Sequence, residues 1–119
     1  MKKQTYITIT GINYYYGRKP FEVGRIVKLE KETDNEYDSD AIRVTMPILD
    51  KIGYVANSSY TVSEGTLSAS RIYESIKKKA YAKVMFVTGN SVIAVIVDKD
   101  EAKKGKRIKV KKKELEYYL

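Results

Sequence analysis

The chain has 119 residues, 43% of them hydrophobic, which is enough for one well-buried core and argues against disorder. It contains no cysteine and no histidine, which excludes disulfides, a zinc site built on these ligands and the commonest general base. The net charge is +8, divided between residues 1–98 (14 basic, 11 acidic, +3) and residues 99–119 (9 basic, 4 acidic, +5). This basic excess either attracts polyanions or is a solvated run that aids solubility.

The N-terminus is charged, but no apolar stretch of about 7 to 15 residues follows it, so no secretory signal is predicted. The longest apolar run, residues 92–97, is the length of a strand and far below the ~20 residues that span a bilayer. We therefore expect a cytoplasmic protein with no membrane partner.

The first half of the chain has the pattern of short strands separated by turns. Apolar residues alternate with polar ones, and Gly, Pro, Asn and Asp interrupt the alternation. The predicted strands are residues 6–12, 21–32, 41–46 and 52–56. Residues 17–20 and 33–36 are predicted turns, Pro47 ends the third strand, and residues 57–66 are predicted to be a loop or a broken first helix.

The second half contains one helical pattern, over residues 67–79, with Ser68 or Thr66 as the N-cap and Lys77 to Lys79 in the last turn. Residues 81–88 and 91–97 then predict a hairpin, and residues 107–111 an edge strand guarded by lysines. The fold class is therefore mainly β (α+β), a small barrel or rolled sheet with one principal helix. We expect one domain over residues 1–97 and a basic C-terminal extension over residues 98–119.

Three segments of the first half resemble the HIRAN domain. They are Thr10 to Gly17, the run Asn35 to Val44 (Asn-x-Tyr-Asp-x-x-Ala-Ile-x-Val), and Ile52 to Val55. HIRAN domains occur alone in bacteria and phages, and fused to SNF2-type helicase-like remodellers in eukaryotes. The resemblance spans residues 5–97 and implies an OB-like β-barrel that binds the 3′ end of single-stranded DNA. It also implies a role in DNA repair, with a helicase or repair protein as a possible partner. No phosphate-binding loop occurs in the chain, so no ATPase activity is expected.

Three consecutive tyrosines, Tyr14 to Tyr16, can provide aromatic faces for unstacked bases. In an ideal strand they cannot share one surface, although a bend at Gly17 can re-aim a ring. The resemblance implies that Tyr14 and Tyr15 contact the terminal nucleotides. The alternative for each ring is packing in the core or across strands.

Asp38 is an unusual residue for a phosphate-binding groove, because a carboxylate repels the DNA backbone. It is useful there if it accepts a hydrogen bond from the hydroxyl at a strand terminus, and so selects a free 3′-OH. The resemblance places Tyr37 and Asn35 beside it. The alternative is local, since Asn and Asp also bond their own backbone in turns, with Asp40 as a further cap.

Two positions depart from the eukaryotic DNA-binding members. Asn13 stands in place of an arginine, so one phosphate contact is either missing or supplied by Arg18, Lys19 or Arg43, with a solvated surface charge as the alternative for each. Tyr54 stands in place of a histidine, and it can stack or donate its hydroxyl. Met85 or Phe86 corresponds to an aromatic residue that packs on DNA, with burial in the core as the alternative.

We therefore predict a non-enzymatic module that binds single-stranded DNA at a 3′-OH end and needs no cofactor or metal. The expected DNA-binding residues are Tyr14, Tyr15, Arg18, Lys19, Asn35, Tyr37, Asp38, Arg43 and Tyr54. One alternative is an adaptor that binds a protein or RNA, since exposed tyrosines and a basic tail suit both. A carboxylate-metal nuclease using Asp34, Asp38 and Asp40 is the other.

Overall fold

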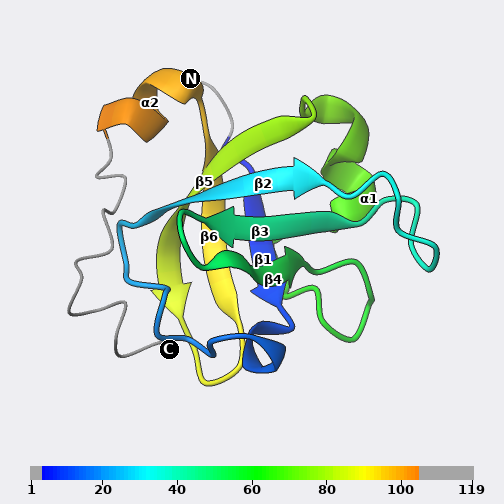
Figure 1. The fold of residues 1–119 in the computed structure, drawn as a ribbon, viewed down its shortest axis with the longest axis horizontal. Coiled ribbons are helices and arrows are strands. Elements are labelled where there is room, and N and C mark those ends of the chain that lie inside the picture. Colours follow the sequence, from blue (N-terminus) through cyan, green and yellow to red (C-terminus); the bar gives the residue numbers. More distant parts are fainter. Residues whose placement is uncertain (1–3, 105–119) are drawn as a thin grey trace.

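Six antiparallel strands close into a barrel in the computed structural model, which describes residues 4–104 (Figure 1). The strands are β1 (Tyr6–Thr10), β2 (Ile26–Lys31), β3 (Ile42–Met46), β4 (Asp50–Val55), β5 (Lys79–Val87) and β6 (Val92–Val97). Their order is β1-β4-β3-β2-β5-β6, and β1 also pairs with β6, which closes the sheet. The prediction of a mainly β fold forming a small OB-like barrel is confirmed.

Alternate side chains of the strands fill the barrel. Ile7, Ile9, Leu29, Val44 and Val84 are fully buried in this main core. A smaller cluster of Ile26, Val95, Val97 and Ala102 is separate from it. Ala102 belongs to α2 (Lys99–Lys104), a short helix that the sequence did not predict and that packs against β5.

The principal helix is shorter than predicted. It consists of α1 (Ala69–Ile72) followed by the 3-10 turn η2 (Tyr73–Ser75), and Ser68 caps it by accepting a hydrogen bond from the Arg71 backbone N–H at 3.3 Å. The prediction of lysines in its last turn was wrong, because Lys79 already pairs with Glu30 as the first residue of β5. Strand pairing in the barrel thus overrides the helical pattern of residues 76–79.

Glycines move two strand boundaries from their predicted places. Gly11 has a φ of 71° and ends β1, and Gly24 has a φ of 91° just before β2. Between Gly11 and β2 the chain forms η1 (Ile12–Tyr14) and a turn. The predicted hairpin is present as β5 and β6. The predicted strand at residues 107–111 lies outside the described residues, and the domain boundary after residue 97 stays a prediction.

A β-bulge between β3 and β4 shapes the outer surface of the barrel. Val44 pairs with Gly53 but Thr45 pairs with Lys51, so Ile52 is an extra residue on β4. A Cβ on Gly53 would lie 3.0 Å from both Ile9 Cγ2 and the Thr10 carbonyl oxygen, which is why β4 can approach β1 only with glycine here. The extra residue at Ile52 also brings the side chains of Lys51 and Tyr54, on either side of the bulge, to the same outer face of the barrel.

Within the described part of the chain, none of the helices has the length and apolar character needed to cross a membrane.

Candidate nucleic-acid interface

The three consecutive tyrosines do not lie on a strand, and they take three different environments. Tyr14 ends η1 and is 89% exposed, whereas Tyr15 follows the turn and is 39% exposed. Tyr16 is half-buried against the main core. The structure therefore offers two rings to a ligand from this segment, Tyr14 and Tyr15, and uses the third for packing.

Lys51, Tyr54 and Glu32 form a compact polar cluster beside Tyr15. Lys51 Nζ donates to the Tyr54 hydroxyl at 2.6 Å, and that hydroxyl donates to Glu32, whose carboxylate oxygens lie at 2.8 and 3.0 Å. Lys51 Nζ is also 3.2 Å from Glu32 Oε2, 4.8 Å from the Tyr54 ring centre and 6.0 Å from that of Tyr15. This lysine thus lies between the residue that follows η1 and the residue that follows β2.

The ionisation of this cluster follows from its contacts. Burial raises the pKa of the Glu32 carboxyl, but hydrogen bonds from Tyr54, Asn35 and Lys51 and the Lys51 charge outweigh it, so the pKa lies below its ordinary 4.5. The hydrogen bond to Tyr54 and the adjacent Glu32 carboxylate hold the pKa of Lys51 above its ordinary 10.5, against the effect of burial. Burial and Glu32 raise the pKa of Tyr54 above 10.0, despite Lys51. At neutral pH the cluster is a neutral phenol between a carboxylate and an ammonium group.

Asn35 holds the turn that follows β2. Its Nδ2 donates to Glu32 Oε1 at 2.9 Å, and its Oδ1 accepts from the backbone N–H groups of Tyr37 and Asp38 at 2.9 and 2.8 Å. The side chain therefore makes the local turn bonds that the sequence offered as an alternative, and it connects the turn to the Lys51 cluster. Tyr37, at the tip of this turn, is 97% exposed.

Asp38 is half-buried, and a ring of hydrogen bonds fixes its carboxylate. Oδ1 accepts from the Asp40 backbone N–H at 2.9 Å, and Oδ2 accepts from Asn57 Nδ2 at 3.1 Å. Asn57 Oδ1 accepts in turn from the Ser70 backbone N–H at 2.8 Å, and the Ser70 hydroxyl donates to Asp40 at 2.8 Å. Since an ionised carboxylate has about four acceptor sites, each oxygen of Asp38 retains room for another donor.

This ring ties the turn between β2 and β3 to α1, and Figure 1 shows the two lying together at one end of the barrel. Acidic residues alternate along the turn at positions 34, 36, 38 and 40. In residues 4–104 no three acidic side chains come close enough together to hold a metal ion.

Of the three predicted cationic residues, Arg43 lies on β3 beside the Lys51 cluster, through its pairing with Tyr54. Arg18 and Lys19 are exposed in the turn after Tyr16. Arg43 pairs with Tyr54 across β3 and β4, and its Nη2 lies 3.6 Å from Glu30 Oε2. Asn13 is exposed, and of the two candidates on β5 Phe86 is 60% exposed while Met85 packs against the smaller cluster.

The structure therefore joins Tyr15, Asn35, Tyr37, Asp38 and Tyr54 through one chain of contacts. It also shows four participants that the sequence did not single out, namely Glu32, Lys51, Asn57 and Ser70. The contact of Lys51 with Tyr54 could not be predicted from the sequence, because residues three apart on a regular strand face opposite sides. Only the bulge brings these two side chains to the same face. Asn57 and Ser70 join Asp38 only through tertiary contacts.

Comparison with known proteins identifies the family. The model of the HIRAN domain matches residues 2–85. Two crystal structures share the fold. A protein from Lactobacillus plantarum has a TM-score of 0.55 at 21% identity, over 77% of this chain and 88% of that one. The HIRAN domain of human HLTF has a TM-score of 0.54 at 15% identity, over 85% of this chain and 81% of that one. No curated protein matches the sequence. The family match covers most of the chain, which therefore belongs to the HIRAN domain family of nucleic-acid-binding modules.

Proposed function

We propose that this domain binds single-stranded DNA at a free 3′-OH end and carries out no chemistry of its own. The observation that carries the proposal is the position of the Asp38 carboxylate. It is fixed by Asn57 and by the Asp40 backbone, it keeps acceptor capacity, and it follows directly in the chain on Tyr37, whose ring is exposed.

Exposed aromatic rings supply affinity without sequence preference. Tyr14, Tyr15 and Tyr37 are held by short backbone turns and present their rings to solvent, so each can stack on an unpaired base for about 1 to 3 kcal/mol. Tyr54 differs, because its hydroxyl is used by Lys51 and Glu32 and its ring is covered by the lysine. Its role in the proposal is to position Lys51.

The negative charge of the turn between β2 and β3 supplies the selectivity for a free 3′-OH terminus. A 3′-OH can donate to Asp38, whereas a 3′-phosphate or a continuing strand would bring negative charge against Asp34, Glu36, Asp38 and Asp40. The acidic residues thus reject everything beyond the last hydroxyl. Asn35 acts as a positioning residue, because it binds the backbone of the two residues that read the end.

Cationic side chains bind the phosphates that precede the terminus. Lys51 lies near the Tyr15 ring and supplies the charge that Asn13 lacks, and Arg18, Lys19 and Arg43 are the further phosphate contacts of this proposal. Such a reader of strand ends suits DNA repair, with a helicase or repair protein as partner.

Fluorescence anisotropy tests the proposal with labelled oligonucleotides that carry a 3′-OH or a 3′-phosphate, at low and at physiological salt. The wild type is expected to prefer the free hydroxyl, and Asp38→Ala to bind both equally. Equal affinity of the wild type for both ends would refute the end reading. An RNA strand of the same sequence decides between DNA and RNA.

A further inference from the structure

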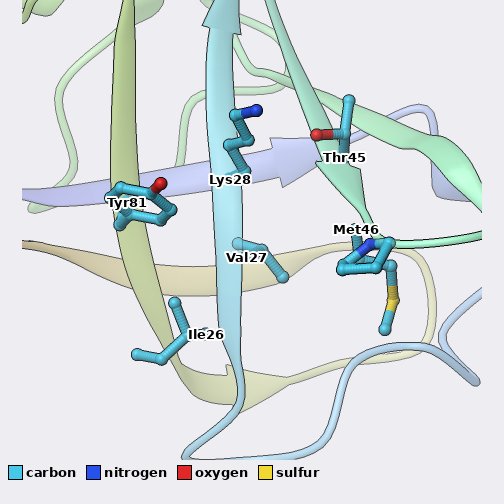
Figure 2. Close-up of a pocket in the computed structure, with 7 residues that line it drawn as sticks. Ile26, Val27, Lys28, Thr45, Met46 and Tyr81 are labelled. Carbon is cyan, nitrogen blue, oxygen red and sulfur yellow. The ribbon is translucent and has the colours of Figure 1, made fainter. Parts of the chain in front are cut away.

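A small cavity on the outer face of β2, β3 and β5 is not part of the site described above. It has a volume of about 160 Å³ and is lined by residues 26–28 of β2, by Thr45, Met46 and Pro47, and by Tyr81. Figure 2 shows Tyr81, Lys28 and Thr45 on three neighbouring strands, with Ile26 and Met46 at one end of the group. Ligand pockets for drug-sized molecules measure about 300 to 1,000 Å³, so this one suits a single small ring system.

The chemistry of the lining suits a nucleobase that carries a phosphate. Ile26, Met46 and Pro47 are apolar, and Tyr81 adds an aromatic ring. Lys28 is partly exposed, with its Nζ 3.9 Å from Glu30 Oε1, and the Thr45 hydroxyl donates to the same oxygen at 3.4 Å. A ring can therefore be buried while its phosphate stays beside an ammonium group in water.

The strand pairing connects this cavity to the proposed end site. Lys51 pairs with Thr45, Thr45 with Lys28, and Lys28 with Tyr81. Directly paired residues point to the same face of a sheet, so Lys51 and Tyr81 are the two ends of one row. Three strand spacings of about 4.8 Å separate them by about 14 Å. At a rise of about 3.4 Å per stacked nucleotide, this distance corresponds to about four nucleotides.

We infer that the cavity is a second base site for the same single strand. It receives a base about four nucleotides to the 5′ side of the phosphate that Lys51 contacts, with Tyr81 as the stacking ring and Lys28 as the phosphate contact. The inference rests on the proposed function, because it assumes that the 3′ terminus of the DNA lies at Asp38 and that the DNA strand runs across β4, β3 and β2.

Length dependence of binding tests this inference. Anisotropy is measured with oligonucleotides from dinucleotide to octanucleotide, all ending in a 3′-OH. The wild type is expected to gain affinity beyond the tetranucleotide. Tyr81→Leu keeps an apolar side chain against the smaller cluster but removes the ring, and it is expected to lose about 5- to 150-fold in octanucleotide affinity while binding the dinucleotide normally. Tyr81→Phe should bind like the wild type.

Lys28→Ala gives a second reading that leaves the aromatic ring of Tyr81 in the chain. It is expected to weaken binding of the octanucleotide and to reduce the salt dependence by about one contact, while Lys99→Ala on α2, outside the row, changes neither. A 2-aminopurine base moved along the strand should change its fluorescence most near the fifth position from the 3′ end.

The outcomes separate the two proposals. Octanucleotide affinity that survives both Tyr81→Leu and Lys28→Ala overturns the second base site, even where the 3′-OH preference holds. A dinucleotide that binds without preference for its 3′-OH overturns the end reading, and with it the register of the second site. Wild-type affinity that reaches its maximum at the dinucleotide also overturns the second site.

Discussion

Lys51 and Tyr54 are three residues apart on β4, yet Lys51 Nζ lies 2.6 Å from the Tyr54 hydroxyl on the outer face of the barrel. The bulge at Ile52 makes this contact possible, because an uninterrupted strand would direct the two side chains to opposite faces. The same bulge sets the start of the row that leads from Lys51 to Tyr81. The one extra residue, Ile52, therefore positions both the Lys51 ammonium group and the path that we propose for the single-stranded DNA.

Removing the Lys51 charge is expected to weaken DNA binding and its salt dependence together. In Lys51→Met the slope of log affinity against log salt should fall in magnitude by about 0.7, the value for one phosphate contact on a single strand. Titrations of a short oligonucleotide at several salt concentrations measure this. Lys103→Met, an exposed position on α2, serves as the matched control. An unchanged slope in Lys51→Met would show that the lysine only supports Tyr54.

Acid should remove the stabilisation that Glu32 provides. Its pKa is lower in the folded protein than the ordinary 4.5, so the contribution is complete above pH 4.5 and is lost as the pH falls through the lowered pKa. Urea unfolding across this acid range is expected to show a smaller loss of stability in Glu32→Gln than in the wild type. Parallel profiles for the two proteins would contradict the assignment.

The close approach of β4 to β1 makes Gly53 sensitive to substitution. A Cβ there would meet Ile9 Cγ2 and the Thr10 carbonyl at 3.0 Å and Ile12 Cγ2 at 3.3 Å, so Gly53→Ala is expected to cost about 1 to 3 kcal/mol of unfolding free energy. Chemical denaturation measures the loss. Gly89→Ala is the control, since a Cβ there has no neighbour within 4 Å, and it should differ little from the wild type.

Exposed rings should matter for binding and not for stability. Tyr37 is 97% exposed, so Tyr37→Ala is expected to change unfolding by less than about 0.5 kcal/mol. If the ring stacks on a base, the same change costs about 1 to 3 kcal/mol of binding free energy. Tyr60 is equally exposed on another loop and provides the comparison, with Tyr60→Ala expected to bind normally. Equal effects of the two substitutions would remove Tyr37 from the site.

Removing a hydrogen bond that holds the Asp38 carboxylate should reduce the preference for a 3′-OH over a 3′-phosphate more than it reduces the affinity for single-stranded DNA. Asn57→Ala removes the bond to Asp38 Oδ2 and the acceptor for the Ser70 backbone N–H. We expect the ratio of affinities for 3′-OH and 3′-phosphate strands to fall several-fold, while stacking on the exposed rings persists. Asn90→Ala in the β5–β6 turn is the control. A full loss of binding would mean that Asn57 supports the whole turn.

The sequence was most informative where one local pattern determined the structure. Alternation predicted the strands, and the run from Asn35 to Val44 located the turn that presents Tyr37 and Asp38. It was least informative where distant segments decide the outcome. The helix beyond Ser75 gives way to the pairing of β5 with β2, and the Lys51 cluster depends on a bulge that leaves no mark in residue composition. The short α2 helix was missed because its apolar contact is a single alanine.

Every described strand of the barrel has a hydrogen-bonded neighbour on both sides. A partner therefore cannot attach by adding a strand to this sheet over residues 4–104, as peptides do on open β-sheets. Recognition falls to side chains on the surface and to the connecting turns. New ligand preferences can then arise by exchanging those turns, while the scaffold that supports them stays the same.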